Sequence, residues 1–396
     1  MAVVFPGASN PPVDNMHFSR GIAVRIAMIG SRGVGSNYGG IERVLDELCP
    51  RLGRLGHQVD VYSDPDVVFE DHGGVRAIRT PAFGGKHLET LSRSLNALGQ
   101  AIGHYDVIHL HAVGPGILSA ATHLFGQRSL VTIHGLDQKR DKWSATARAC
   151  LSLAERALVA NADQITVVSE PLRRYFIERY DVVAALVPNG MPRKVPVAAG
   201  AFLASFGLEP GGYVLFASRL TPEKGCHDLV KAFDALPDGA RLVVAGSSGE
   251  PDYLRTLRAA ANPAKVVFVG HRSGHELAEL FSNAKIFVLP SYVEGMSMAL
   301  LEALAYKVPS LVTDIPENRV VVREHGFYVQ PRDPDGLAAA LKNLLEAPEA
   351  LAAARAALDG LQRPDWDAVA LRYDRLYRAP SRRPVAAVLP QQVGAR

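Results

Sequence analysis

The sequence predicts an α/β protein in which two Rossmann-like domains face each other across a cleft. The chain has 396 residues, which is more than a single hydrophobic core usually organises. Short apolar runs alternate with stretches of helical composition, as they do in parallel sheets covered by helices on both faces. These runs form two sets, separated at residues 187–192 by a segment of prolines and turn residues.

The apolar runs are predicted to be buried parallel strands, because continuous apolar composition is typical of strands covered on both faces. Ligands of such sheets bind beyond the carboxyl ends of the strands, so function is expected in the loops that follow them. The predicted strands comprise residues 24–29, 58–62, 107–110, 130–133 and 165–168 in the first set, and 213–217, 241–245, 266–269, 286–289 and 310–312 in the second.

The domain boundaries follow from this pattern. Residues 364–379 include Trp366, Tyr373 and Tyr377 and predict a last helix. We expect a loose N-terminal extension over residues 1–22, an N-terminal domain over 23–190, a C-terminal domain over 191–363 and a loose tail over 380–396.

The composition excludes several classes of protein. It is 48% hydrophobic and 21% charged, as in soluble enzymes, and a net charge of +3 is too small to indicate nucleic-acid binding. No apolar run reaches the length of a membrane span, and residues 1–10 lack the basic start of a signal peptide. Cys49, Cys150 and Cys226 have no metal-site spacing and favour a reducing compartment. We therefore expect a cytoplasmic protein.

Two glutamates eight positions apart, Glu294 and Glu302, stand in otherwise apolar or small surroundings. Glu294 is predicted in the loop after strand 286–289, and Glu302 inside a helix over residues 296–306. Glu302 shares a helix face with apolar residues, where a carboxylate is costly to bury without a partner. An isolated glutamate in this place would more often pair with an arginine or lie at a rim.

Glycines and cations follow the first strand of each domain. The loop 30–42 contains five glycines, so its backbone can approach a ligand closely, but Ile41-Glu42 rules out a Walker A loop. Alone, it indicates either a phosphate-proximal loop or tight packing of strand on helix. Arg219 and Lys224 flank a turn at Pro222 and are either ligands of a diphosphate or solvated surface cations.

Polar residues end three strands near the predicted cleft, at His134, Ser169 and Asn189. Upstream, His109 and His111 are expected to point to opposite faces of their strand, with His111 as a packed structural residue. The sequence contains two Asp-Pro-Asp triplets. The one at 64–66 predicts a turn after a strand, and the one at 333–335 predicts a helix N-cap followed by proline. We therefore predict no dedicated metal site and no cofactor.

Taken together, these motifs resemble the retaining glycosyltransferases of family 4, also called group 1, which have the GT-B fold. The resemblance rests on the Glu294-x7-Glu302 spacing, on Arg219-x4-Lys224 followed by glycine, and on the Gly39-Gly40 loop. It covers about residues 23–378 and is strongest over 218–309. The chain departs from the family pattern at Gly295-Met296 and in the loop 313–318, which lacks the usual glycine-rich opening.

The resemblance implies a role for each motif. Glu294 and His134 would contact the transferred sugar, and Glu302 would hold the ribose. The implied catalytic residues are His134, Arg219, Lys224 and Glu294; the donor nucleotide-binding residues are Gly40, Arg219, Lys224, His271, Gly295, Met296 and Glu302; and the residues lining the acceptor side or the cleft are Gly39, Asp137, Ser169 and Asn189.

The implied reaction moves a sugar from a nucleotide-diphosphate sugar to the hydroxyl of a saccharide, lipid-linked glycan or small molecule. The N-terminal domain would take the acceptor, the C-terminal domain the donor, and the last helix would cross back to the N-terminal domain. Such enzymes are expected in cell-envelope, polysaccharide or glycoconjugate synthesis. Lys139, Arg140, Lys142 and Arg148 either meet anionic lipid at a membrane surface or form a solvated helix face.

Three alternatives stay open on the sequence alone. A nucleotide-sugar epimerase or hydrolase would use the same architecture. A nucleotide-dependent dehydrogenase would explain the first glycine loop but not Arg219, Lys224 and the two glutamates together. A non-catalytic sugar-binding protein would not need intact motifs in both domains.

Overall fold

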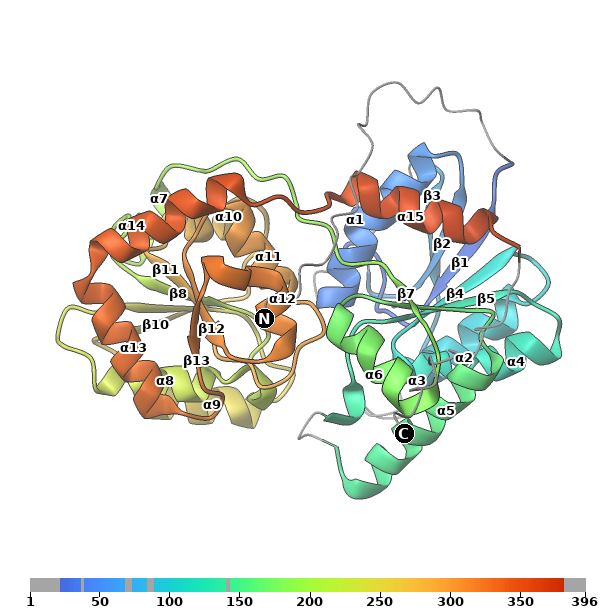
Figure 1. The fold of residues 1–396 in the computed structure, drawn as a ribbon, viewed down its shortest axis with the longest axis horizontal. Helices are drawn as coiled ribbons and strands as arrows, with labels where there is room; N and C mark the ends of the chain where they lie inside the picture. Colours follow the sequence, from blue (N-terminus) through green and yellow to red (C-terminus); the bar gives the residue numbers. More distant parts are fainter. Residues whose placement is uncertain (1–21, 37–38, 68–72, 84–88, 140–142, 381–396) are drawn as a thin grey trace, which may run out of the picture.

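A computed structural model describes residues 22–36, 39–67, 73–83, 89–139 and 143–380 (Figure 1). Two parallel sheets lie in separate lobes, each with helices on both faces, which confirms the predicted α/β class with two Rossmann-like domains. No helix in this part of the chain has the length and apolar content needed to cross a membrane. The predicted loose ends, 1–22 and 380–396, lie outside the described residues except for Ile22 and Pro380.

The N-terminal domain is built on a seven-stranded sheet of order β3-β2-β1-β4-β5-β6-β7. Its strands are β1 (Arg25–Ile29), β2 (Gln58–Ser63), β3 (Val75–Arg79), β4 (Val107–His111), β5 (Ser129–Ile133), β6 (Gln164–Val167) and β7 (Ala185–Leu186). Its helices are α1 (Gly40–Arg54), α2 (Glu89–Ala101), α3 (Val113–Gly116), α4 (Ser119–Leu124), α5 (Ala145–Asn161) and α6 (Glu170–Tyr180).

The C-terminal domain is built on a six-stranded sheet of order β10-β9-β8-β11-β12-β13. Its strands are β8 (Val214–Ala217), β9 (Leu242–Ala245), β10 (Val266–Gly270), β11 (Ile286–Leu289), β12 (Ser310–Thr313) and β13 (Phe327–Val329). Its helices are α7 (Ala201–Ser205), α8 (Cys226–Asp234), α9 (Pro251–Ala260), α10 (Gly274–Ser282), α11 (Met298–Ala305), α12 (Pro316–Val322), α13 (Pro334–Glu346) and α14 (Pro348–Ala357).

The strand order reverses once in each sheet, and the motifs predicted from the sequence lie in loops beside these two reversal points. The reversal lies between β1 and β4 in the first sheet and between β8 and β11 in the second. Loops that leave such neighbouring strands in opposite directions open a crevice at the carboxyl edge of the sheet. The glycine loop follows β1, Arg219 and Lys224 follow β8, and Glu294 follows β11, so all of them belong to the two crevices.

The chain passes between the domains twice, and the two passages run together. Met191 donates its N–H to the Pro364 carbonyl at 2.9 Å and forms a parallel bridge with Asp365. A Cβ at Gly190 would lie 2.7 Å from the Trp366 nitrogen, so only glycine fits this approach. The last helix, α15 (Trp366–Arg378), packs on α1 and buries Trp366 in the core of the N-terminal domain (Figure 1).

Candidate active site

The two glutamates lie after β11, one in the loop and one in the following helix. The side chains of Glu294 and Glu302 are 6% and 8% exposed. Helix α11 begins at Met298, two residues later than predicted, because the Ser297 hydroxyl accepts a hydrogen bond from the Leu300 N–H at 3.3 Å and caps the helix. The predicted placement, one glutamate in the loop and one in the helix, is confirmed.

Lys224 and Glu294 form an ion pair, with Nζ 2.6 Å from Oε1. Lys224 ends the short turn 222–224, and Gly225 follows with a positive φ of 67°. A Cβ at Gly225 would lie 2.1 Å from the Pro290 carbonyl oxygen. Glycine therefore lets the turn after β8 approach the end of β11 closely enough for the lysine to reach the glutamate.

The glycine loop of the N-terminal domain lies against Arg219 of the C-terminal domain. A Cβ at Gly39 would lie 3.8 Å from the Arg219 side chain, and one at Gly40 would lie 3.9 Å from Cγ of Met298. Within the described ranges, the Arg219 guanidinium makes no ion pair. The permanently charged guanidinium therefore lies beside glycine backbone at the start of α1, and this arrangement suits phosphate oxygens.

Glu302 is paired with two cations. Nη2 of Arg43, in the first turn of α1, lies 2.9 Å from Oε1 and 2.8 Å from Oε2, and Nζ of Lys194 lies 3.2 Å from Oε1. The sequence analysis considered that Glu302 would pair with an arginine, and this pairing is present. The arginine belongs to the N-terminal domain, whereas Glu302 belongs to the C-terminal domain. Neither cation was predicted, although Arg43 stands only three residues after the Gly39-Gly40 pair.

His134 belongs to a stack of three histidines. Nδ1 of His111 lies 3.0 Å from Nε2 of His134, and the His109 and His111 rings are 4.1 Å apart. The expectation that His109 and His111 point to opposite faces is wrong, because residues two apart on a strand share a face. Burial lowers the pKa of all three, to about 4 for His134, where nearby Asp137 acts in the opposite direction.

The two domains touch beside His134. A Cβ at Gly295 would lie 1.7 Å from the His134 carbonyl oxygen, so the loop bearing Glu294 reaches the end of β5 only with glycine in that position. Asn189 donates from Nδ2 to the Met296 carbonyl at 3.3 Å and holds the same loop from the linker side. The loop that follows Glu294 is therefore fixed against the N-terminal domain.

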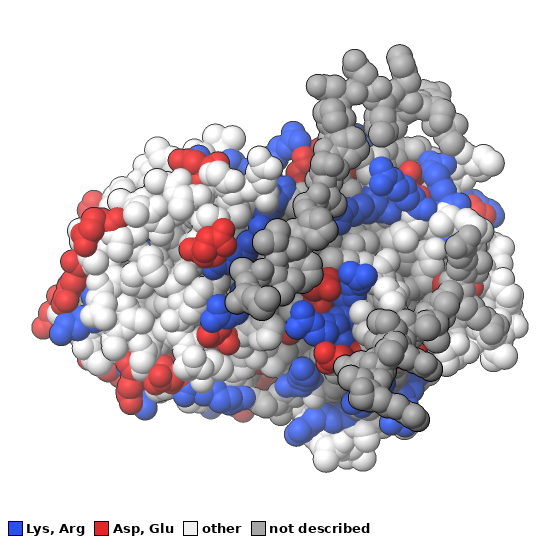
Figure 2. Space-filling model, viewed as in Figure 1, with Lys and Arg blue, Asp and Glu red and all other residues white. Residues whose placement is uncertain are grey.

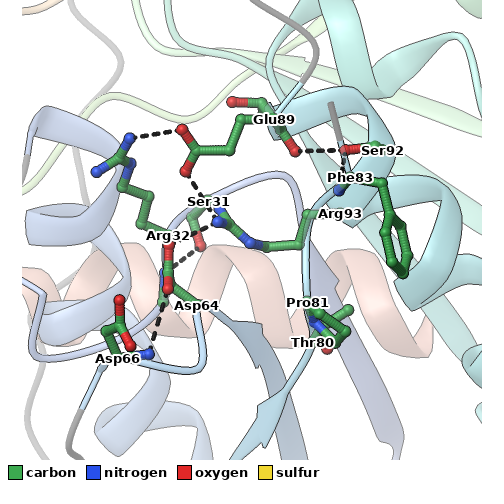
Figure 3. Close-up of polar contacts among 12 residues, drawn as sticks. Ser31, Arg32, Asp64, Asp66, Thr80, Pro81, Phe83, Glu89, Ser92 and Arg93 are labelled. Carbon is green, nitrogen blue, oxygen red and sulfur yellow. Dashed lines mark hydrogen bonds and ion pairs between the residues drawn. The ribbon is translucent and has the colours of Figure 1, made fainter. Parts of the chain in front are cut away.

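A network of charged residues lies at the N-terminal half of the site, and two of its members, Arg32 and Glu89, line the cavity (Figure 3). Glu89, at the start of α2, accepts from Nη2 of Arg32 and from Nη2 of Arg93, each at 2.9 Å. Arg93 is 4% exposed and also donates to Asp64 at 2.6 Å. Asp64 of the first aspartate triplet thus orients Arg93. The sequence offered no signal for Glu89.

The second aspartate triplet has a structural role in the C-terminal domain. Its Asp333 caps α13 by accepting a hydrogen bond from the Gly336 N–H at 2.9 Å.

A single cavity of about 960 Å³ brings these groups together from both domains. On the face shown in Figure 2, Lys and Arg side chains gather near the junction of the two lobes. The predicted residues that line the cavity are Gly39, Gly40, His134, Asp137, Asn189, Arg219, Lys224, His271, Glu294, Gly295, Met296 and Glu302. Lining residues that the predictions missed include Arg32, Glu42, Arg43 and Glu89.

Ser169 does not line this cavity, which corrects the prediction. It is 1% exposed and lies at the N-cap of α6. Helix α6 begins directly after Ser169 and contacts α12 of the C-terminal domain. Position after a strand is therefore not sufficient, because His134 after β5 and Asn189 after β7 line the cavity whereas Ser169 after β6 is enclosed at the start of a helix.

Two facing Rossmann-like domains, with cations and buried carboxylates meeting in a cavity between them, give this chain the architecture of a two-domain α/β enzyme with its site between the lobes. The sequence profile described as glycosyl transferases group 1 matches residues 205–357. The profile described as glycosyltransferase family 4 matches residues 38–194. The chain belongs to the group 1, family 4 glycosyltransferases, and its fold is GT-B.

Three proteins are similar to this chain in sequence or in fold. The glycogen synthase of Mycobacterium tuberculosis is 29% identical in an alignment that covers 87% of this chain and 92% of the relative. The structure of sucrose-phosphate synthase from Thermosynechococcus elongatus has a TM-score of 0.76 and 25% identity, covering 90% of this chain and 98% of the other. The structure of Anabaena HepE with UDP-glucose has a TM-score of 0.71 and 18% identity, covering 89% and 99%.

Proposed function

We propose that the protein is a retaining, metal-independent glycosyltransferase that moves a sugar from a nucleotide-diphosphate sugar to an acceptor hydroxyl. The observation that carries the proposal is the meeting of Arg219, Lys224, Glu294 and Glu302 with the Gly39-Gly40 loop in one cavity. The M. tuberculosis relative bears the name of a synthase of a glucose polymer, and HepE was solved with UDP-glucose. Both support a nucleotide-sugar donor.

The difficult step is breakage of the bond between the anomeric carbon and the diphosphate oxygen, because negative charge builds on the leaving diphosphate. Arg219 would donate to its oxygens, and Lys224 would supply a second positive charge. Fixed charges in a site that excludes water stabilise such a transition state more strongly than water does. Glu294, which is held by Lys224, would accept hydrogen bonds from the sugar, together with neutral His134.

The acceptor would enter from the N-terminal half of the cavity, along the wall that contains Arg32 and Glu89. Its hydroxyl oxygen would form the new bond to the anomeric carbon on the face from which the diphosphate leaves. Its proton would pass to the departing diphosphate oxygen, so that no side-chain nucleophile is needed. The product therefore keeps the anomeric configuration of the donor.

Metal independence is proposed because Arg219 and Lys224 already supply positive charge where the diphosphate would lie. Both aspartate triplets have other roles, Asp64 as a partner of Arg93 and Asp333 as a helix cap. Use in cell-envelope, polysaccharide or glycoconjugate synthesis belongs to the same proposal. A cytoplasmic location and contact with a membrane surface stay predictions; Arg140 and Lys142 lie outside the described residues.

A panel of nucleotide sugars tests the proposal. A true donor should raise the melting temperature of the protein, since a ligand that binds only the folded state stabilises it by mass action. With an accepted sugar or polyol, NMR of the product should show the anomeric configuration of the donor. Release of free sugar without any acceptor, or formation of an isomer, would favour the hydrolase or the epimerase instead.

A further inference from the structure

The carboxylate of Glu302 is shared between the two domains. Arg43 reaches it from α1 in the N-terminal domain with one nitrogen, Nη2, placed between both oxygens at 2.9 and 2.8 Å. Lys194, in the linker, lies 3.2 Å from Oε1. Both cations are partly exposed, with side chains at 30% and 26%, whereas the carboxylate is nearly buried. The ion pair therefore closes the cleft at the place proposed for the ribose.

The number of acceptor positions on the carboxylate limits what Glu302 can hold at one time. An ionised carboxylate offers about four lone-pair positions, two on each oxygen. Arg43 takes one on each oxygen and Lys194 takes another on Oε1. A ribose that presents its two adjacent hydroxyls to this carboxylate needs two positions. The ribose and both cations therefore cannot all be accommodated.

Arg43 is the cation that is free to leave. Nζ of Lys194 lies 5.9 Å from the centre of the Tyr306 ring and is held there by a second, cation–π contact. In the part of the chain that the structure describes, Glu302 is the only carboxylate within 4 Å of the Arg43 guanidinium, and Asp46, three residues further along α1, attracts the same charge from farther away. Lys194 can therefore keep the buried carboxylate neutralised after Arg43 departs, which avoids the cost of an unpaired buried charge.

We propose that Arg43 competes with the ribose of the nucleotide for Glu302 and thereby sets the affinity of the enzyme for its donor and its product. The inference rests on the proposed function, because it takes Glu302 as the ribose ligand. When a nucleoside diphosphate binds, the contact between the domains through Arg43 is exchanged for hydrogen bonds to the sugar. When the product leaves, Arg43 returns, so the exchange lowers product affinity and assists release.

Calorimetric titration with uridine, adenosine and guanosine diphosphates tests the proposal, and the diphosphate that the wild type binds best is then used throughout. Arg43→Met should bind it more tightly, by about five-fold, which corresponds to loss of a competing, partly exposed ion pair of about 1 kcal/mol. The KM for the nucleotide sugar should fall by a similar factor. If product release limits turnover, kcat should fall as well. A lower KM together with a lower kcat is not what a folding defect would produce.

Two further variants make the result decisive. Arg193→Met removes one positive charge from the next linker residue, whose partners are Asp365 and Asp367, and should leave the affinity unchanged. Arg43→Lys keeps the charge on a side chain with a shorter reach, and should give an intermediate gain. Thermal melts of every variant confirm that each one is folded.

Each outcome has a distinct meaning. Weaker binding by Arg43→Met would show that Arg43 binds the nucleotide itself, and an unchanged affinity would show that the pair has no energetic role; either result overturns the proposal. If the wild type binds none of the nucleoside diphosphates, the proposed function fails instead. Small-angle scattering adds an independent reading, since protein without nucleotide should have a larger radius of gyration in Arg43→Met than in the wild type.

Discussion

The ammonium of Lys224 lies 2.6 Å from the carboxylate of Glu294, and the two side chains are only 12% and 6% exposed. One follows β8 and the other follows β11, so the pair joins the two loops at the reversal point of the C-terminal sheet. A buried pair of this kind is costly to break from one side, because the remaining charge loses its partner.

Lys224→Met is therefore expected to cost about 3 kcal/mol of folding free energy and to reduce turnover by about 10²-fold. The double variant Lys224→Met/Glu294→Gln should recover most of the stability and none of the activity. Chemical denaturation and steady-state kinetics measure the two effects separately. Recovery of activity in the double variant would mean that Lys224 only neutralises Glu294.

Arg219→Ala should reduce turnover by about 10²-fold, as removal of one transition-state donor does, and should leave the melting temperature nearly unchanged. The reason is that Arg219 lines the cavity and makes no ion pair within the described ranges. Arg193→Ala, at a side chain that is 79% exposed, is the matched control. Normal turnover by folded Arg219→Ala would remove this residue from the mechanism.

The two glutamates should differ in their ligands. Glu302→Gln is expected to weaken the nucleoside diphosphate and the donor alike, since both contain the ribose. Glu294→Gln should leave nucleoside diphosphate affinity nearly unchanged while donor binding or transfer falls. Titration of both variants with both ligands checks the assignment, and the opposite pattern would reverse the two roles.

Activity is expected to survive EDTA, because side chains supply the charge opposite the diphosphate. The assay uses protein dialysed against the chelator and then supplied with a donor free of divalent ions. Loss of turnover that Mg²⁺ or Mn²⁺ restores would refute metal independence.

Acid should destabilise the protein through the histidine stack. The pKa of His134 is lowered from 6.5 to about 4 by burial, so the folded state binds fewer protons than the unfolded state between these values. Stability contributed by the neutral ring is therefore present above about pH 6.5 and is lost as the pH falls towards 4. His134→Asn should flatten the fall of melting temperature over this range. His123→Asn, at an exposed position of α4, should not.

Most of the fold was predictable because buried strands have an apolar signature. Each of the predicted strands is found within one residue of its expected ends. The sequence missed β3, β7 and β13, and all three are edge strands of their sheets. Edge strands are covered on fewer sides, so they are short or contain charged residues, as β3 does with Arg76 and Arg79.

The donor half of the site was more predictable than the acceptor half for a different reason. Arg219, Lys224, Glu294 and Glu302 have fixed spacings within short segments, and short segments can be recognised. The network around Glu89 joins residues from three separate segments, and a single sequence contains no signal for such a meeting. The Arg43–Glu302 pair spans 259 positions and depends on how the two domains face each other.

The paired passages at Met191 and Asp365 restrict how the enzyme can move. The two passages are joined at an isolated bridge, so a movement of one passage also displaces the other. We therefore expect the lobes to open and close by bending of both passages at this one point. Each opening would let substrates in and products out, and each closing would return Gly295 to the same carbonyl of His134.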